Sequence, residues 1–253
     1  MNRILVLGAG RSATSLISYL LNTAASRSWK VCVADYALQL AEEKVDSHPN
    51  GVAVAFNINN DEQKEALIAE NDVVISMLPA KFHPSVAATC LKFGKHLITA
   101  SYVSDDMKAM DAKAKKKGLL FLNECGLDPG IDHMSAKKVI DFIRNDKGQQ
   151  LRAFESFTGG LLAPDPSDDN PWEYGFTWNP RNVVLAGQGT VKFIQEGRYK
   201  YIPYHKLFRR IEMIHIPGHG YFEGYANRDS LKYLEVYELE GIQTLYRGTL
   251  RRP

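Results

Sequence analysis

The polar side chains that could do chemistry gather in three short stretches of the chain. Ser101 and Tyr102 place two hydroxyls side by side, and Asp128 places a carboxylate in a glycine-proline turn. The third stretch, Asn227-Arg228-Asp229, brings an amide, a guanidinium and a carboxylate together. A guanidinium can bind a carboxylate through two parallel hydrogen bonds, and a carboxylate can bind an amine or move a proton. These stretches could therefore bind the carboxylates and amines of a small substrate.

Each stretch also has a purely structural interpretation. Ser101 and Tyr102 could make ordinary loop hydrogen bonds, and Asp128 could simply form a turn. Arg228 could pair with Asp229 as a surface ion pair, which would contribute little to stability. The residue types alone leave both interpretations open.

Two groups compete for a proton-transfer role. Asp128 is the first catalytic candidate, and the hydroxyl of Tyr102 is assigned to catalysis beside it. His133 is a rival general acid or base because its ordinary pKa lies near neutrality. A capping or buried structural role explains His133 equally well.

A glycine turn near the start of the chain predicts a dinucleotide site. The apolar run Ile4-Leu-Val-Leu7 leads into Gly8-Ala-Gly-Arg-Ser-Ala13, where a helix is expected to begin. Gly8 permits the tight turn, Gly10 lets a pyrophosphate approach the backbone, and Ala13 lets helix and strand pack closely. The helix start supplies unpaired N–H groups and a partial positive charge. The candidate cofactor-binding residues here are Gly8, Gly10, Arg11, Ser12 and Ala13.

An acidic residue at the end of the next apolar run supports this interpretation, because a glycine turn alone can be structural. The run 30–34 follows at βαβ spacing and ends at Asp35, 25 residues after Gly10. A carboxylate there accepts hydrogen bonds from the adenosine ribose 2′-OH and repels a 2′-phosphate. No Arg follows Asp35 immediately, so we expect NAD, with NADP as the alternative.

The first half of the chain alternates short apolar runs with amphipathic stretches, which is typical of an α/β fold with a doubly wound parallel sheet. Asp61 is the expected N-cap of the third helix, and Gly94 and Gly118 are expected helix stops. The predicted strands are residues 4–7, 31–34, 52–56, 73–77, 96–99 and 119–122. The predicted helices are residues 13–24, 37–45, 61–70, 84–93 and 105–117.

Ligands of such sheets bind beyond the carboxyl ends of the strands, where the strand order reverses. Ser76, Met77 and Leu78 end or follow the fourth strand, and we assign them to the cofactor. Ser101 and Tyr102 follow the fifth strand, where their hydroxyls could reach a substrate carboxylate. The βα alternation stops at about Gly130. We therefore predict a dinucleotide-binding domain at residues 1–129 and a substrate domain at residues 130–253.

Composition excludes several classes of protein. A net charge of +2 is too small to predict nucleic-acid binding, and no apolar stretch approaches the ~18 residues of a membrane span. Cys32, Cys90 and Cys125 fit neither a disulfide framework nor a zinc motif. His215 and His219 lack a third ligand at metal spacing, so no metal is expected. From the cysteine pattern and the lack of a membrane span we expect a cytoplasmic protein. We also expect it to be a homodimer.

Six ordered motifs closely resemble the saccharopine dehydrogenase family of the glutamate-forming type, also called saccharopine reductase, over the whole chain. They are Thr99-Ala-Ser-Tyr-Val-Ser104, Gly126-Leu-Asp-Pro-Gly-Ile-Asp-His133, Gly159-Gly160 before Ala163-Pro164, Phe176-Thr-Trp-Asn-Pro-Arg181, Tyr225-Ala-Asn-Arg-Asp-Ser230 and Arg247-Gly-Thr-Leu250.

The resemblance implies a Rossmann domain followed by an α+β substrate domain with a mixed sheet. It also implies an NAD(P)-linked enzyme of lysine metabolism that oxidises saccharopine to an imine. Hydrolysis of the imine gives glutamate and 2-aminoadipate 6-semialdehyde, or the reaction runs in reverse. By resemblance, the substrate-binding residues are Ser101, Tyr102, Asp128, Asn227, Arg228 and Asp229, with Trp178 and Arg181 at cofactor- or substrate-side positions.

This sequence departs from the family pattern in three ways. Asp35 stands where fungal members carry Arg and prefer NADP, and Thr158 stands where Cys precedes the paired glycines. Family members continue well past the Arg-Gly-Thr-Leu motif, so we expect a chain truncated at its C-terminus, which could be inactive. Two alternatives stay open, namely a carboxynorspermidine dehydrogenase-like enzyme and a non-catalytic dinucleotide-binding module.

Overall fold

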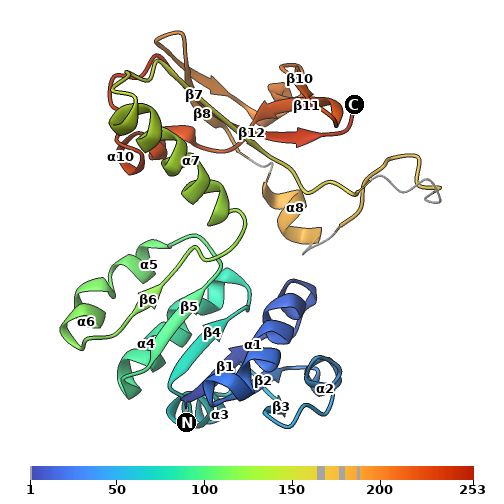
Figure 1. Ribbon diagram of the computed structural model, residues 1–253, viewed down its shortest axis with the longest axis vertical. Coiled ribbons are helices and arrows are strands. Elements are labelled where there is room, and N and C mark those ends of the chain that lie inside the picture. Colours follow the sequence, from blue (N-terminus) through green and yellow to red (C-terminus); the bar gives the residue numbers. More distant parts are fainter. Residues whose placement is uncertain (1, 164–168, 177–179, 187–188) are drawn as a thin grey trace. The chain divides into compact units, whose positions relative to one another are not determined.

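The computed structural model describes residues 2–163, 169–176, 180–186 and 189–253 (Figure 1). The chain divides into two compact units, residues 1–131 (unit 1) and residues 132–253 (unit 2). This division falls two residues after the domain boundary predicted between residues 129 and 130. Among the described residues, every helix is too short or too polar to cross a lipid bilayer.

Unit 1 contains a parallel sheet with the strand order β3-β2-β1-β4-β5-β6. The order reverses between β1 and β4, which is the doubly wound topology predicted from the sequence. Its strands are β1 (Asn2–Leu7), β2 (Trp29–Asp35), β3 (Gly51–Ala55), β4 (Val73–Ser76), β5 (His96–Thr99) and β6 (Phe121–Leu122). All six predicted strands are therefore confirmed, with small shifts at their ends.

Alternate side chains of β1 point to opposite faces of the sheet and bury two separate cores. Ile4 and Val6 pack with the helices at 14–27 and 38–45, whereas Leu5 and Leu7 pack with the helices at 61–69, 83–93 and 105–108. This two-sided burial explains why the strand is apolar throughout. The helices of unit 1 are α1 (Thr14–Arg27), α2 (Leu38–Val45), α3 (Asp61–Ala69), α4 (His83–Phe93), α5 (Asp105–Lys108) and α6 (Asp111–Lys116), with 3₁₀ turns at Arg11–Ala13 and Ala80–Phe82.

Two sequence predictions about these helices were wrong. The predicted helix at 105–117 is two short helices, because a tightened turn in which Met110 N–H donates to Met107 O separates them. That turn lets Met107 and Met110 contact the same core. The N-cap of α3 is Asn60, whose side chain accepts from Gln63 N, while Asp61 lies inside the first turn. Gly94 adopts a left-handed conformation as the C-cap of α4, and Gly118 has φ +66° just after α6.

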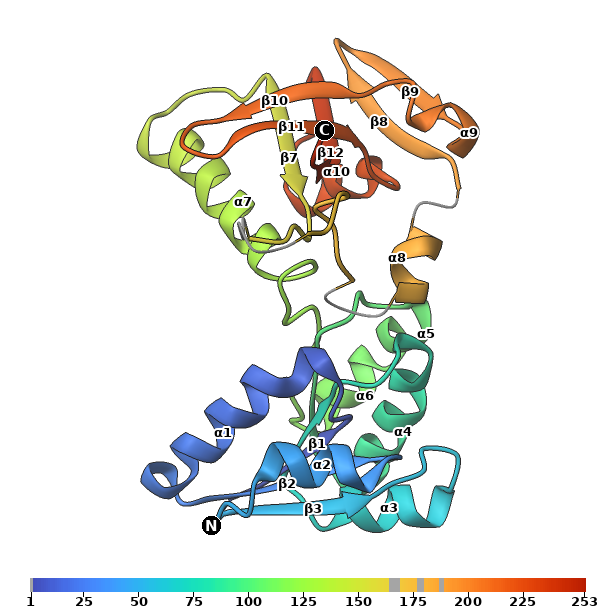
Figure 2. The same ribbon diagram turned by 90° about the vertical axis from the view of Figure 1, so that its right-hand side faces the viewer.

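Unit 2 is built on a sheet with the order β10-β11-β12-β8-β9, in which β7 also pairs with β12. The β7–β12 pair is parallel and the others are antiparallel, so the predicted mixed sheet is confirmed (Figure 2). Its strands are β7 (Ala153–Thr158), β8 (Val191–Gln195), β9 (Arg198–Ile202), β10 (Glu212–Ile216), β11 (Gly220–Ala226) and β12 (Thr244–Arg251).

One helix, α7 (Ile131–Asp141), begins at the division between the units and continues into a π-helical turn at Phe142–Asp146. Ile140 of α7 packs with Leu239 and Leu245 in one core of unit 2. A second core gathers around Phe193 and Tyr246 of the sheet. The remaining helical segments are α8 (Pro180–Ala186), α9 (Tyr204–Leu207), the 3₁₀ turn Ser230–Lys232 and α10 (Tyr233–Val236).

Candidate functional site

The glycine turn after β1 has the geometry that the sequence predicts. Gly8 has φ +103°, a conformation that residues with a Cβ rarely adopt, and its N–H donates to Ala34 O over 2.8 Å. A Cβ on Gly8 would lie 3.2 Å from the backbone carbonyl of Met77. Gly8 is therefore needed both for its conformation and for the close approach of β4.

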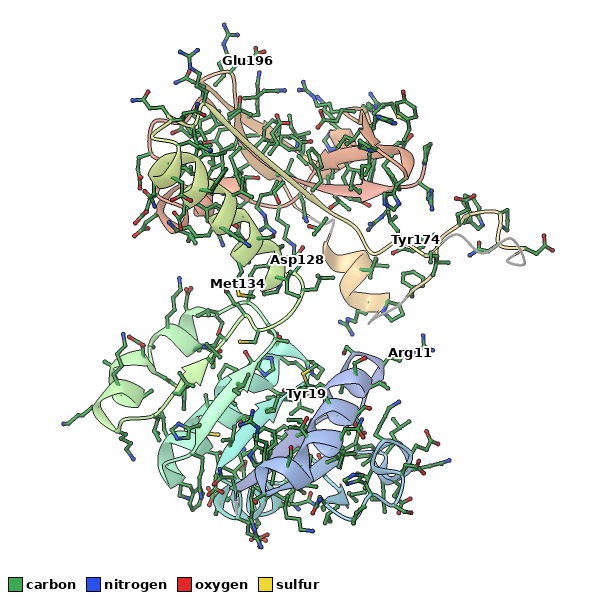
Figure 3. All side chains as sticks on the ribbon, viewed as in Figure 1. Arg11, Tyr19, Asp128, Met134, Tyr174 and Glu196 are labelled. Carbon is green, nitrogen blue, oxygen red and sulfur yellow. The ribbon has the colours of Figure 1, made fainter. Side chains whose placement is uncertain are left out.

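The space beside Gly10 is open. A Cβ built on Gly10 would meet no atom within 4 Å, and no side chain of the described residues caps the 3₁₀ turn Arg11–Ala13 that leads into α1. Ala13 is fully buried against the sheet, while Arg11 and Ser12 are exposed. Figure 3 shows Arg11 at the end of α1 that adjoins the turn. This arrangement could bind a pyrophosphate through backbone N–H groups.

Asp35, the last residue of β2, holds the glycine turn in place. Its Oδ2 accepts a hydrogen bond from Ala9 N over 2.7 Å, and its Oδ1 accepts one from Ala37 N over 3.0 Å. The sequence did not predict this structural role. Each carboxylate oxygen has two acceptor sites, so the partly exposed side chain can still accept from a ribose hydroxyl.

The end of β4 lies beside this turn, where Met77 N–H donates to Leu7 O over 2.8 Å. Ser76 is fully buried, and its hydroxyl lies 3.0 Å from Nδ1 of His83. The side chain of Ser76 thus bonds within the protein. Met77 and Leu78 are the residues of this stretch that are partly exposed at the carboxyl end of the strand.

His83 is a candidate that the sequence analysis missed. It begins α4, is only 3% exposed, and its Nε2 lies 2.8 Å from the hydroxyl of Ser101. Burial lowers the pKa of His83 below its ordinary value of 6.5, so the imidazole is neutral near pH 7. Its place at the start of the helix after the fourth strand was the signal that could have found it.

The two residues assigned to catalysis lie together. Tyr102 OH donates to Asp128 Oδ1 over 2.5 Å, which joins the loop after β5 to the loop after β6. Figure 3 shows Asp128 in the loop that precedes α7. The exposed carboxylate carries a hydrogen bond that orients one of its oxygens. Such a group can bind an amine or exchange a proton with it.

Side-chain hydrogen bonds hold the segments after β5 and β6 against each other. Glu124 Oε1 accepts from Val103 N over 2.9 Å, and Thr99 Oγ1 donates to Asn123 Oδ1 over 3.1 Å. Gly130 has φ +148°, and a Cβ there would lie 2.0 Å from the carbonyl oxygen of Gly126. The turn that carries Asp128 therefore has room only for glycine at its end.

In unit 2, the turn at 227–229 is held mainly through its backbone. Asn227 N–H donates to Arg247 O over 2.8 Å, and Arg228, at φ +48°, accepts from Lys192 N through its carbonyl over 2.9 Å. Asp229 accepts from Leu231 N and pairs with Lys192 Nζ over 3.2 Å. The carboxylate of Asp229 therefore has a cationic partner other than Arg228.

A buried ion pair supports this turn and was also missed by the sequence analysis. Arg247 lies 2.8 Å from the carboxylate of Asp132, and both side chains are almost fully buried. The Arg247 guanidinium lies over the ring of Tyr233 at 4.4 Å, and Arg247 N–H donates to Ser230 Oγ over 3.0 Å. Asp132 lies in the motif at 126–133 and Arg247 in the motif at 247–250, and these two motifs were the sequence signal that could have indicated the pair.

His133 is packed among aromatic side chains. Its ring stacks on Tyr233 with centroids 5.1 Å apart, and its Nδ1 lies 2.5 Å from Tyr237 OH. These contacts favour the structural interpretation of His133 over the catalytic one.

Two further predicted residues are close to α8 in the sequence. Trp178 lies outside the described residues, and Arg181 is exposed near the start of α8.

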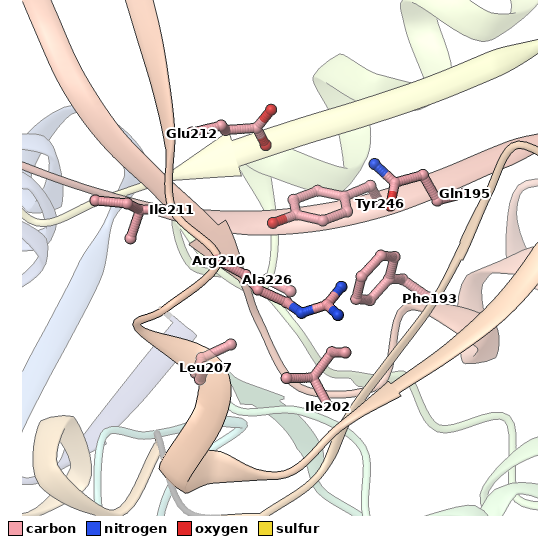
Figure 4. Close-up of a pocket in the computed structure, with 9 residues that line it drawn as sticks. All are labelled: Phe193, Gln195, Ile202, Leu207, Arg210, Ile211, Glu212, Ala226 and Tyr246. Carbon is pink, nitrogen blue, oxygen red and sulfur yellow. The ribbon is translucent and has the colours of Figure 1, made fainter.

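Unit 2 also contains a cavity of about 210 Å³ that none of the predicted site residues lines (Figure 4). Its wall is mainly apolar, with the Arg210 guanidinium drawn among Phe193, Ile202 and Leu207. Glu212, also on the wall, has a raised pKa because of burial and the nearby Glu155. The remaining lining residues are Gln195, Ile211, Ala226 and Tyr246.

Comparison with known proteins matches both halves of the chain to one family. Residues 4–122 match the saccharopine dehydrogenase NADP binding domain, and residues 126–253 match the saccharopine dehydrogenase C-terminal domain. The chain is 36% identical to the NADP(+), L-glutamate-forming saccharopine dehydrogenase of Schizosaccharomyces pombe over 252 residues, covering 99% of this chain and 55% of that protein. It is 37% identical to an alpha-aminoadipic semialdehyde synthase of Arabidopsis thaliana, covering 98% of this chain and 25% of that protein.

A solved structure gives the same result for the fold. The apo histidine-tagged saccharopine dehydrogenase (L-Glu forming) from Saccharomyces cerevisiae superposes with a TM-score of 0.88 at 33% identity. The match covers 100% of this chain and 55% of that one. The chain therefore spans about half the length of the fungal relatives and a quarter of the plant one. With two domain matches and this structural likeness, the chain belongs to the saccharopine dehydrogenase family.

Proposed function

We propose that this protein is an NAD(P)-dependent oxidoreductase that acts on the CH–NH bond of saccharopine. The products are L-glutamate and 2-aminoadipate 6-semialdehyde, or the reaction runs in reverse. The observation that carries this proposal is the Tyr102–Asp128 hydrogen bond at the carboxyl edge of the sheet that also carries the open glycine turn. The family membership supplies the substrate class.

The dinucleotide would bind at the glycine turn. The N–H groups at the start of the Arg11–Ala13 turn would hold the pyrophosphate, and Asp35 would accept from the ribose. When bound, the nicotinamide supplies the hydride acceptor for the carbon next to the secondary amine. Met77 and Leu78 would line the cofactor near the point where the strand order reverses.

Asp128 would act on the amine of the substrate. The hydrogen bond from Tyr102 fixes Oδ1, so the carboxylate is oriented before substrate arrives. Loss of hydride from carbon leaves a C=N bond, and water adds to that bond before the C–N bond breaks to give aldehyde and amine. A carboxylate can take the proton of the attacking water and return it to the leaving amine. Asp128 is proposed for both transfers.

The carboxylates of the substrate need donors. Ser101 offers a hydroxyl, and Asn227 and Arg228 offer an amide and a guanidinium. Arg228 is proposed as the principal carboxylate ligand because its guanidinium can donate two parallel hydrogen bonds. Asp229, which pairs with Lys192, is proposed to bind an amine of the substrate.

NAD is the proposed cofactor, although the fungal relatives carry NADP(+) in their names. The support is Asp35, whose carboxylate lies at the end of β2 and is fixed by two backbone N–H groups. A fixed negative charge there disfavours a 2′-phosphate. NADP is the competing cofactor.

The direct test is the oxidation of saccharopine by the natural full-length protein, followed through the absorbance of the reduced nicotinamide with NAD and with NADP. We expect turnover with saccharopine and a preference for NAD. Turnover of carboxynorspermidine without turnover of saccharopine would contradict the proposed substrate. Tight NADH binding without turnover of either would show a dinucleotide-binding module instead.

A further inference from the structure

His83 forms a buried bridge between two neighbouring strands of unit 1. Its Nδ1 lies 3.0 Å from the hydroxyl of Ser76, the last residue of β4, and its Nε2 lies 2.8 Å from the hydroxyl of Ser101, which follows β5. Ser76 is 0% exposed and His83 is 3% exposed, whereas Ser101 is partly exposed. The bridge therefore runs from the interior to a residue at the carboxyl edge of the sheet.

A neutral imidazole carries one N–H donor and one acceptor lone pair. Two arrangements are therefore possible for this bridge. In the first, Nε2–H donates to Ser101, and Nδ1 accepts from Ser76 O–H. In the second, Nδ1–H donates to Ser76, and Nε2 accepts from Ser101 O–H. In the second arrangement the hydroxyl hydrogen of Ser101 is bonded to His83. In the first it stays available to a ligand.

The burial of Ser76 selects the first arrangement. Among the described residues, His83 is the one hydrogen-bond partner of the Ser76 hydroxyl. In the second arrangement the hydrogen of this fully buried hydroxyl would have no acceptor, which costs about 1–3 kcal/mol. In the first arrangement every donor of the bridge has an acceptor except the hydrogen of Ser101, which is directed away from His83.

We propose that His83 is a positioning residue that keeps the Ser101 hydroxyl available as a donor to a substrate carboxylate. A carboxylate offers only acceptors, so a hydroxyl that binds it must donate. Nε2–H satisfies a lone pair of Ser101 and thereby turns its hydrogen outward. The identity of the ligand as an amino-acid carboxylate rests on the proposed function, whereas the protonation of His83 does not.

The protonation state can be measured without any substrate. In protein labelled with ¹⁵N-histidine, we expect the ¹⁵N–¹H correlation spectrum at neutral pH to show His83 as a neutral imidazole protonated at Nε2. The His83→Gln variant assigns the signal by its disappearance. A proton on Nδ1 would overturn the inference, whatever the enzyme turns over.

Two variants of similar polarity test the effect on the substrate. The side-chain amide N–H of His83→Gln can reach the position of Nε2 and donate to Ser101, whereas that of His83→Asn reaches only the position of Nδ1. In the natural full-length protein, we expect His83→Asn to raise KM for the amino-acid substrate about tenfold, and His83→Gln to raise it less than about threefold. KM for the dinucleotide should not change in either variant.

A double-mutant cycle separates positioning from a general structural role. Ser101→Ala should raise KM for the amino-acid substrate about as much as His83→Asn does, and the double variant should be no worse than Ser101→Ala alone. Additive losses, or equal losses in His83→Gln and His83→Asn, would overturn the inference. Failure of the wild-type protein to turn over saccharopine would refute the proposed function instead, and the ¹⁵N spectrum would still decide the role of His83.

Discussion

In unit 1 the candidate side chains lie where strands of one sheet end, whereas in unit 2 they lie in a turn held by distant segments. Gly8, Asp35 and Ser101 each follow or end a strand, and the parallel sheet places all these ends along one edge. The turn at 227–229 depends instead on Lys192 and on the strand that carries Arg247. Local geometry thus positions the candidate residues of unit 1, and long-range contacts position those of unit 2.

This difference has an energetic consequence. A substitution in a glycine turn destabilises it mainly by straining the backbone of the turn itself, because the steric restriction on φ is local. The conformation of the turn at 227–229 can also be lost by substituting distant residues that hold it in place. Arg247 and Asp132 are 115 residues apart in sequence, and removing either takes an ion-pair partner from a nearly buried charge. The comparison predicts that the largest single losses of stability occur in unit 2.

The strongest test of that comparison is Arg247→Met. Removing the guanidinium takes away a cationic partner of the buried Asp132 carboxylate, and we expect unit 2 to lose about 3 kcal/mol of unfolding free energy. Hydrogen exchange in residues 132–253 of the intact chain measures the loss. The control is Lys192→Met, which removes a partly exposed ion pair and should cost less than about 1 kcal/mol. Equal costs would contradict the comparison.

Asp128→Asn tests the chemistry of unit 1 without disturbing its glycine turn. The amide keeps the shape of the side chain but cannot accept a proton, so we expect turnover to fall about 100-fold. Fluorescence titration with NADH should show unchanged affinity. The matched variant Tyr102→Phe keeps the carboxylate and removes the hydrogen bond that orients it, so it should lose only about tenfold. A normal rate in both variants would show that the proposed site is wrong.

The two glycines of the turn should respond differently to the same substitution. Gly8→Ala forces a Cβ into a positive-φ conformation 3.2 Å from the Met77 carbonyl and should cost about 2 kcal/mol of stability. Gly10→Ala adds a methyl group to open space and should change stability by less than about 0.5 kcal/mol. Both variants should bind NADH weakly. Thermal unfolding and NADH titration measure the two effects, and tight NADH binding by Gly10→Ala would place the pyrophosphate elsewhere.

Asp35→Asn tests whether this carboxylate sets the choice of cofactor. The substitution removes the charge that repels a 2′-phosphate and leaves one carbonyl oxygen for the two N–H groups of Ala9 and Ala37. We expect the ratio of the NADPH and NADH dissociation constants to fall about tenfold. Glu42→Gln, an exposed acid on α2, should leave that ratio unchanged. The same ratio in Asp35→Asn and the wild type would remove Asp35 as the determinant of specificity.

The sequence predicted unit 1 well because its signals are local. Continuous apolar runs mark strands buried on both faces, and the spacing from Gly8 to Asp35 reflects a single βαβ step. The errors were local as well. Asn60 and Asp61 are both good helix caps, and the backbone conformation that makes Asn60 the cap is not encoded in residue type.

Unit 2 could be predicted only in outline. Turn residues and aromatic runs indicate strands, but the pairing of β7 with β12 joins segments far apart in sequence. The Asp132–Arg247 pair and the contact of Lys192 with Asp229 depend on that pairing. His83 was missed for a related reason. Its place at the start of α4 could be read from the sequence, but its two hydrogen-bond partners at the ends of neighbouring strands could not.

The pH dependence of stability gives the smallest expected effect. It tests whether the side chain of His83, at the edge of the sheet in unit 1, is shielded from water. Burial lowers the pKa of His83 in the folded protein, whereas in the unfolded chain it stays near 6.5. Below about pH 6.5 the unfolded state therefore binds more protons, and wild-type stability should fall relative to that of His83→Gln until the folded-state pKa is reached. Urea unfolding at about pH 7.5 and about pH 5.5 measures this difference. Parallel pH profiles would mean that His83 takes up protons in the folded state as readily as in the unfolded chain, so the edge would be open to water there, unlike the packed surroundings of Arg247.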